Sequence, residues 1–182
     1  MSRIPTPETI EAAPAKSQDV LNAVKAQLGV VPNMFRLLAT SPTTLEGFVA
    51  LNGAMGKGSL SAATRERLAL AIAEVNGCDY CLAAHTYLGQ NLAKLTEAEV
   101  IANRKGGSTD AKADAAVRFA VKVAQARGQV SAQDVADVKA AGYSDAEIVE
   151  ITVNVALNTL TNYVNSVFDT AIDFPAAKSL AA

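Results

Sequence analysis

The chain is predicted to be all-α, because two features of its sequence recur from end to end. Apolar residues repeat at helical spacing between Gly, Pro, Ser, Thr and Asp residues that stop and start helices, and no strand-type alternation is present. Capping-box sequences stand at residues 96–99 (TEAE) and 144–147 (SDAE). Without alternating strands and helices, a thioredoxin-type fold is excluded.

Length and composition indicate one globular domain. Half of the 182 residues are hydrophobic, which is enough for a sizeable core. Residues 1–16 hold three prolines and no periodic apolar face, so we expect an extended N-terminal arm followed by a single helical domain over residues 17–182.

Charge and hydropathy argue against several classes of partner. The chain has 16 Lys and Arg against 18 Asp and Glu, a net charge of −2, and no basic run, so nucleic acid and anionic membranes are not expected partners. Neither a secretory signal nor a membrane-spanning stretch is predicted. With only two cysteines and no export signal, we expect a cytoplasmic protein.

Local signals divide the chain into successive helices. The residues expected to cap helices at their N-termini are Ser17 or Asp19, Ser41, Ser61, Thr96, Thr109 or Asp110, Ser131 and Ser144. The glycines expected to end helices are Gly29, Gly56, Gly58, Gly77, Gly89, Gly106, Gly107, Gly128 and Gly142. A last helix of about 25 residues, roughly 38 Å long, begins at Ser144.

The chemistry of the chain is expected at Cys78, Cys81 and His85. Both cysteines and the only histidine fall within eight positions, after a helix break at residues 76–77. Their spacing puts all three side chains on one helix face, and Cys78 in the first turn, where the helix dipole favours a thiolate. Three interpretations follow: a redox pair with a proton-transfer histidine, a metal site completed by a carboxylate, or a coincidence of small buried residues.

The redox interpretation is favoured. A structural zinc site usually takes two ligand pairs from separate places, and the chain has one cluster. We therefore predict no bound metal and a reversible disulfide between Cys78 and Cys81, whose one-turn spacing lets the two sulfurs meet.

Residues 64–67 (TRER) and 77–85 (GCDYCLAAH) resemble the core of the alkyl hydroperoxidase D-like proteins in the carboxymuconolactone decarboxylase superfamily. Further segments resemble its peroxidase-related branch: 29–33 (GVVPN), 141–145 (AGYSD), 160–165 (LTNYVN) and 172–175 (IDFP). One position departs from the best-described members, which carry a second relay histidine where this chain has Tyr80.

The resemblance implies a helical bundle with the CxxC pair at a helix N-terminus and a dithiol peroxidase activity. In the family the relay carboxylate lies twelve residues before the first cysteine, which selects Glu66, with Glu74 as the alternative. His85 is one turn from Cys81 and two turns from Cys78, so we expect it to lower the pKa of Cys81. Cys81 is accordingly predicted to attack the peroxide and Cys78 to resolve.

The expected partners follow from this chemistry. The substrate is a hydroperoxide, no cofactor is tightly bound, and electrons return from a lipoyl-type dithiol or a reductase protein, as the resemblance implies. The resemblance also implies a homo-oligomer. Two alternatives stay open: a lactone decarboxylase-like enzyme, which has no use for a CxxC pair, and a non-enzymatic redox-sensing or metal-holding helical oligomer.

A row of amides marks the last predicted helix. Its members at helical spacing are Asn154, Asn158, Asn162 and Asn165. Buried amides need hydrogen-bond partners. They are expected either to bond to neighbouring helix ends or a second subunit, or to contact the substrate.

Overall fold

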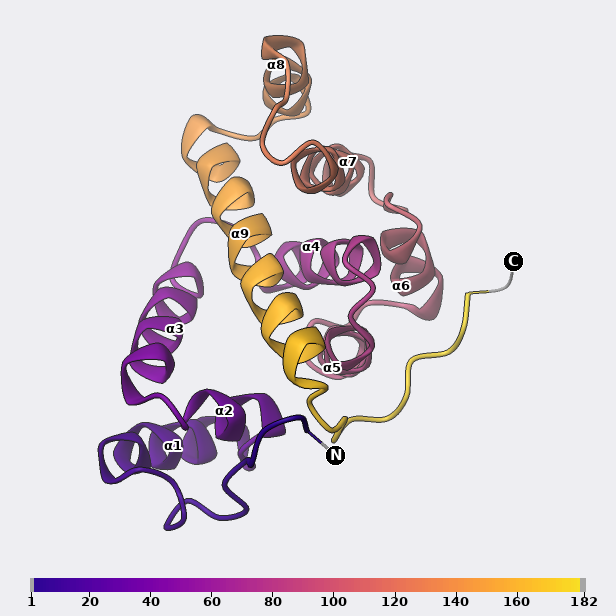
Figure 1. Ribbon diagram of the computed structural model, residues 1–182. Coiled ribbons are helices and arrows are strands. Elements are labelled where there is room, and N and C mark those ends of the chain that lie inside the picture. The colour runs from indigo at the N-terminus through magenta and orange to yellow at the C-terminus, as the bar shows by residue number, and fades with distance from the viewer. Residues whose placement is uncertain (1, 181–182) are drawn as a thin grey trace.

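The computed structural model describes residues 2–180 and contains nine α-helices and no strand in that range (Figure 1). This confirms the all-α prediction. The helices are α1 (Ala15–Leu28), α2 (Asn33–Leu38), α3 (Pro42–Met55), α4 (Ala62–Val75), α5 (Asp79–Asn91), α6 (Glu97–Arg104), α7 (Ala111–Gln125), α8 (Ala132–Ala140) and α9 (Asp145–Phe168).

Helix α4 lies at the centre of the molecule. It contacts α5, α6, α7 and α9, and its side chains Leu68, Leu70 and Ile72 are fully buried. The long helix α9 crosses it and also contacts α3, α5, α7 and α8 (Figure 1). The site described below forms where α4, α5 and α9 meet. No helix within residues 2–180 has the length and apolar character needed to cross a membrane.

Most of the predicted helix starts are confirmed. The side chains that accept a backbone N–H at a helix N-terminus are Ser61, Thr96, Asp110, Ser131 and Ser144. The first helix is an exception, because it begins at Ala15, with Pro14 rather than Ser17 or Asp19 at the N-cap. Ser17 lies inside the helix, where its buried hydroxyl donates to the Ala39 carbonyl at 2.8 Å.

Gly89 does not end its helix, contrary to the prediction. Helix α5 continues to Asn91, and Gly89 is buried within it. A Cβ at this position would lie 3.2 Å from Leu95 Cδ1. The glycine therefore serves close packing of the following segment against α5 and does not stop the helix.

The capping box predicted at residues 96–99 forms only in part. Thr96 Oγ1 accepts the Glu99 N–H at 3.1 Å, but the Glu99 carboxylate turns into the protein instead of returning to the cap. Its donors are Arg67 Nε at 2.7 Å, Asn103 Nδ2 at 2.9 Å, Ser108 Oγ at 2.5 Å and the Thr109 N–H at 2.8 Å. This buried carboxylate fastens the loop between α6 and α7 to α4.

We predict that Glu99→Gln lowers the free energy of unfolding at neutral pH by about 2 kcal/mol, the scale of hydrogen bonds to a charged group. Burial raises the pKa of Glu99, but hydrogen bonds from Ser108, Thr109 and Asn103 outweigh it and bring the pKa from 4.5 to about 2. Because the folded pKa is the lower one, this stabilisation is complete above pH 4.5 and is lost as the pH falls towards 2.

Chemical denaturation at several pH values measures both effects. The matched control is Glu97→Gln, two residues away on the same helix, where the carboxylate is exposed and pairs with Lys178. It should leave the stability unchanged. Equal stability losses for the two variants would contradict the assignment.

Candidate active site

A sharp turn between α4 and α5 creates the site. Asn76 ends α4, Gly77 adopts φ +63°, and the Cys78 N–H donates to the Ala73 carbonyl at 3.0 Å. Cys78 thereby becomes the N-cap of α5, and its Sγ accepts the Cys81 N–H at 3.4 Å. The first sulfur thus sits at the N-terminus of the helix, where backbone N–H groups lack partners within the helix.

The two cysteines form a buried dithiol. Both are free, each is 2% exposed, and their Sγ atoms lie 2.9 Å apart. Cys81 Sγ accepts a hydrogen bond from Asn165 Nδ2 at 3.3 Å and lies within hydrogen-bonding distance of Cys78 Sγ. The Asn165 side chain thus ties α9 to the dithiol.

Of the two thiols, Cys78 has the lower pKa. The hydrogen bond from Cys81 lowers the pKa of Cys78 to about 7 against the effect of burial, and His85 contributes in the same direction. The hydrogen bond to Cys78, together with burial, raises the pKa of Cys81. The expectation that His85 would give Cys81 the lower pKa is not met, because the hydrogen bond between the two thiols lowers the pKa of Cys78 and raises that of Cys81.

Helix α5 folds back on α4 and brings His85 to Glu66. The distance from His85 Nδ1 to Glu66 Oε2 is 2.8 Å, and the two side chains are 23% and 21% exposed. Burial lowers the pKa of His85, but the charge and hydrogen bond of Glu66 outweigh it, and the pKa ends above its ordinary value. Glu74, the alternative relay carboxylate, pairs instead with Arg104 Nε at 2.7 Å.

The amide row on α9 divides into two kinds. Asn154 and Asn158 each donate to the backbone carbonyl four residues earlier, at 2.8 Å. Asn162 accepts from Asn76 Nδ2 at 2.8 Å, and Asn165 contacts Cys81. The sequence indicated the row but not which members reach the dithiol.

The segment after α9 covers the dithiol cluster, a role that the sequence did not reveal. Phe174 packs with the buried cluster that includes both cysteines, and its ring meets Tyr80 edge-on at 5.8 Å. The Tyr80 hydroxyl accepts the Met34 N–H at 3.2 Å and donates to Asp173 Oδ1 at 2.9 Å. Tyr80 therefore ties α2 and the C-terminal segment to α5.

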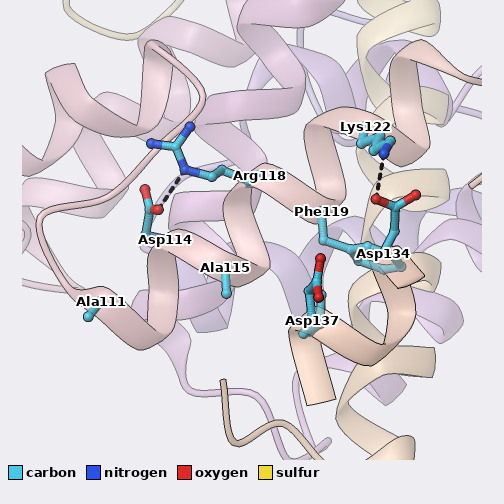
Figure 2. Close-up of a pocket in the computed structure, with 9 residues that line it drawn as sticks. Ala111, Asp114, Ala115, Arg118, Phe119, Lys122, Asp134 and Asp137 are labelled. Carbon is cyan, nitrogen blue, oxygen red and sulfur yellow. Dashed lines mark hydrogen bonds and ion pairs between the residues drawn. The ribbon is translucent and has the colours of Figure 1, made fainter. Parts of the chain in front are cut away.

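Other parts of the surface are less suited to chemistry. A pocket of about 320 Å³ lies between α7 and α8, and four of its five charged side chains form ion pairs, Arg118 with Asp114 and Lys122 with Asp134 (Figure 2). Within residues 2–180, no group of three or more His, Cys, Asp or Glu side chains is arranged to hold a metal ion.

We predict that Glu66→Gln lowers the pKa of His85, whereas Glu74→Gln leaves it unchanged. The reason is that Glu66 alone of the two carboxylates contacts the imidazole. The chain has one histidine, so a single ring-proton resonance reports its titration by NMR. A lower pKa in the Glu74 variant with no change in the Glu66 variant would show that the relay is assigned to the wrong carboxylate.

Solved structures share this fold over nearly the whole chain. The alkylhydroperoxidase AhpD core of an uncharacterized peroxidase-related protein from Ralstonia eutropha JMP134 is 27% identical, with a TM-score of 0.84 over 94% of this chain and 92% of that one. A peroxidase-related protein from Silicibacter sp. TM1040 is 24% identical, with a TM-score of 0.82 over 93% and 91%. The debrominase Bmp8 is 20% identical, with a TM-score of 0.76 over 92% and 91%.

A family comparison covers the region that contains the dithiol. Residues 42–126 match the Carboxymuconolactone decarboxylase family, a span that includes Glu66, both cysteines and His85. No curated protein matches the chain. The family match over residues 42–126 and the fold shared with AhpD-like proteins support the carboxymuconolactone decarboxylase/AhpD superfamily.

Proposed function

We propose that the protein is a dithiol peroxidase that reduces hydroperoxides through a cycle between the Cys78–Cys81 dithiol and its disulfide. The superfamily supports a peroxidase-related or decarboxylase-like role. The observation that favours the peroxidase is the dithiol itself, with sulfurs 2.9 Å apart and a pKa of about 7 at Cys78. Decarboxylation of a lactone has no use for such a pair.

The reaction needs two electrons, which the dithiol supplies. A thiolate attacks the hydroperoxide, an S–O bond forms, the O–O bond breaks, and the sulfur becomes a sulfenic acid. The second thiolate then attacks that sulfur, forms the S–S bond and expels the oxygen as water. The hydroperoxide is reduced to an alcohol and water, and the dithiol is oxidised to a disulfide.

His85 and Glu66 provide the protons. The raised pKa of His85 favours the imidazolium, which can protonate the departing alkoxide. Glu66 holds the ring through Nδ1 at 2.8 Å and stabilises its positive charge. The neutral imidazole left after this transfer can accept a proton from the second thiol before the disulfide forms.

The disulfide must be reduced from outside, since the proposed cycle includes no tightly bound cofactor. We propose a lipoyl-type dithiol or a reductase protein as the electron donor and the cytoplasm as the site of action. Both cysteines are 2% exposed, so covering side chains such as Phe174 must move before a reductant reaches the sulfurs.

We predict turnover of cumene hydroperoxide with dihydrolipoamide by the wild-type protein and none above background by Cys78→Ser or Cys81→Ser. His85→Gln should lower the rate roughly a hundredfold or more, the usual contribution of a general acid. Glu74→Gln serves as the control, because Glu74 pairs with Arg104, and should keep its activity.

Two results would overturn the proposal. Turnover by the Cys78→Ser or the Cys81→Ser protein would show that the mechanism does not need the dithiol. Reversible disulfide formation without peroxide turnover, tested with both small and bulky hydroperoxides, would favour a redox sensor.

We also propose that the protein forms a homo-oligomer through α9. One face of this helix is apolar and exposed, at spacings of three, four and seven residues: Val149, Ala156, Leu160, Tyr163 and Val167. No charged residue occurs from Ile151 to Phe168. An uncharged apolar seam with this period suits the same seam of a second copy, as in paired helices.

We predict that Tyr163→Glu converts an oligomeric wild-type protein to monomers, because the exposed Tyr163 lies on this seam and a carboxylate would be buried without a partner. Sedimentation velocity at micromolar concentration measures the change. Val135→Glu, on the exposed side of α8, is the control and should leave the assembly intact. A monomeric wild-type protein would contradict the proposal.

A further inference from the structure

Two amides on α9 are buried beside the dithiol with polar atoms that have no partner. Asn162 and Asn165 are 0% and 2% exposed. Asn165 Nδ2 donates to Cys81 Sγ at 3.3 Å, while its Oδ1 has no hydrogen-bond partner among the described residues. Asn162 Oδ1 accepts from Asn76, while its Nδ2 likewise lacks a partner there.

The side chains of Asn162 and Asn165 do not hydrogen-bond to the backbone of their own helix, in contrast to two neighbouring amides. Asn154 and Asn158, on the same helix, satisfy their Nδ2 groups on the backbone of the preceding turn. A buried polar atom without a partner costs about 1–3 kcal/mol. Stability alone therefore does not explain an amide pair that leaves one donor and one acceptor unpaired next to a reactive sulfur.

An unpaired donor beside an unpaired acceptor is the complement of an O–H group, which accepts one hydrogen bond and donates another. Both amides influence Cys81, since each lowers the pKa of its thiol against the larger effects of Cys78 and burial. We propose that Asn162 and Asn165 bind the hydroxyl of the sulfenic acid that forms when Cys81 attacks the hydroperoxide. This inference rests on the proposed peroxidase function.

The lower pKa of Cys78 is compatible with attack by Cys81 as the first step. The sulfurs are 2.9 Å apart, so the Cys81 proton can pass to the Cys78 thiolate as Cys81 attacks. The S–O bond then forms on Cys81, the O–O bond breaks, and imidazolium His85 protonates the alkoxide. The Asn165 N–H stabilises the charge that Cys81 carries during this step.

Cys78 is suited to the second step. Its pKa of about 7 makes its thiolate available at neutral pH once His85 has taken the proton. The Cys78 thiolate attacks Cys81 Sγ, the S–O bond breaks, and the hydroxide leaves as water with a proton from His85. The amides hold the hydroxyl that becomes this leaving group.

The test uses a Cys78→Ser background, in which a sulfenic acid cannot be resolved. One equivalent of hydrogen peroxide followed by dimedone should give an adduct on Cys81. Adding Asn165→Leu should lower the rate constant of adduct formation about tenfold, for loss of one hydrogen bond to a charged sulfur, and Asn162→Leu should lower it for loss of the donor to the hydroxyl that forms. The same variants should raise the pKa of the Cys81 thiol, read from the ultraviolet absorbance of the thiolate.

Asn158→Leu is the matched control, a buried amide on the same helix that bonds to backbone. It should leave both the rate and the thiol pKa unchanged. If Asn165→Leu does not fold, the smaller Asn165→Ser takes its place. Thermal unfolding distinguishes a chemical role of Asn165 from a structural one. Asn165→Leu should retain the wild-type stability, because it removes an unpaired buried acceptor.

Three different negative results would contradict three different parts of the proposal. If peroxide oxidises neither cysteine in any variant, the proposed function itself fails. If the adduct forms only on Cys78 in a Cys81→Ser protein, while Cys81 stays unmodified in the Cys78→Ser protein, the division of roles is wrong. If Cys81 reacts equally with and without the amides and its pKa does not move, the amides have no part in the chemistry.

Discussion

The turn at Asn76 and Gly77 is the constraint on which the site depends. Gly77 adopts a left-handed conformation, φ +63°, that other residues enter only at a cost. It lets the chain leave the buried helix α4 and start α5 at once, with Cys78 as the N-cap. The same reversal places His85 against Glu66, nineteen positions away in the sequence. One turn therefore sets the positions of both the dithiol and the paired His85 and Glu66.

The structure separates satisfied polar groups from unsatisfied ones. Away from the site, the carboxylates of Glu99 and Glu150 each accept several hydrogen bonds. Glu99 holds the loop before α7, and Glu150 on α9 accepts the backbone N–H groups of Ser59 and Leu60 before α4. Beside the dithiol, Asn162 and Asn165 keep unpaired atoms. The carboxylates of Glu99 and Glu150 thus hold the loops around α4, while two of the unpaired buried polar atoms lie on α9 beside the proposed site.

Tyr80 shows how one change of residue alters the surroundings of the dithiol. Where the resemblance led us to expect a second relay histidine, a phenol links α2, α5 and Asp173. Burial strongly raises the pKa of this phenol, so it stays protonated and serves as a hydrogen-bonding anchor. In the proposed mechanism the proton relay accordingly consists of His85 and Glu66, and Tyr80 instead anchors the C-terminal segment that packs against the dithiol cluster.

The sequence by itself determined the features that depend on residues close together in the chain. Caps such as Ser61 and Ser144 follow from hydrogen bonding within the first turn of their own helices, and the place of Cys78 at the start of α5 follows from the helix break just before it.

Only the tertiary structure decided the rest, because packing between distant segments selects among locally equivalent choices. It separated Glu66 from Glu74 by giving the latter Arg104, and it drew the Glu99 carboxylate out of its capping box. It also brought Asn165 of α9 to Cys81, 84 positions apart in the sequence. These contacts depend on how α4, α5 and α9 cross, and no spacing within one helix encodes that crossing.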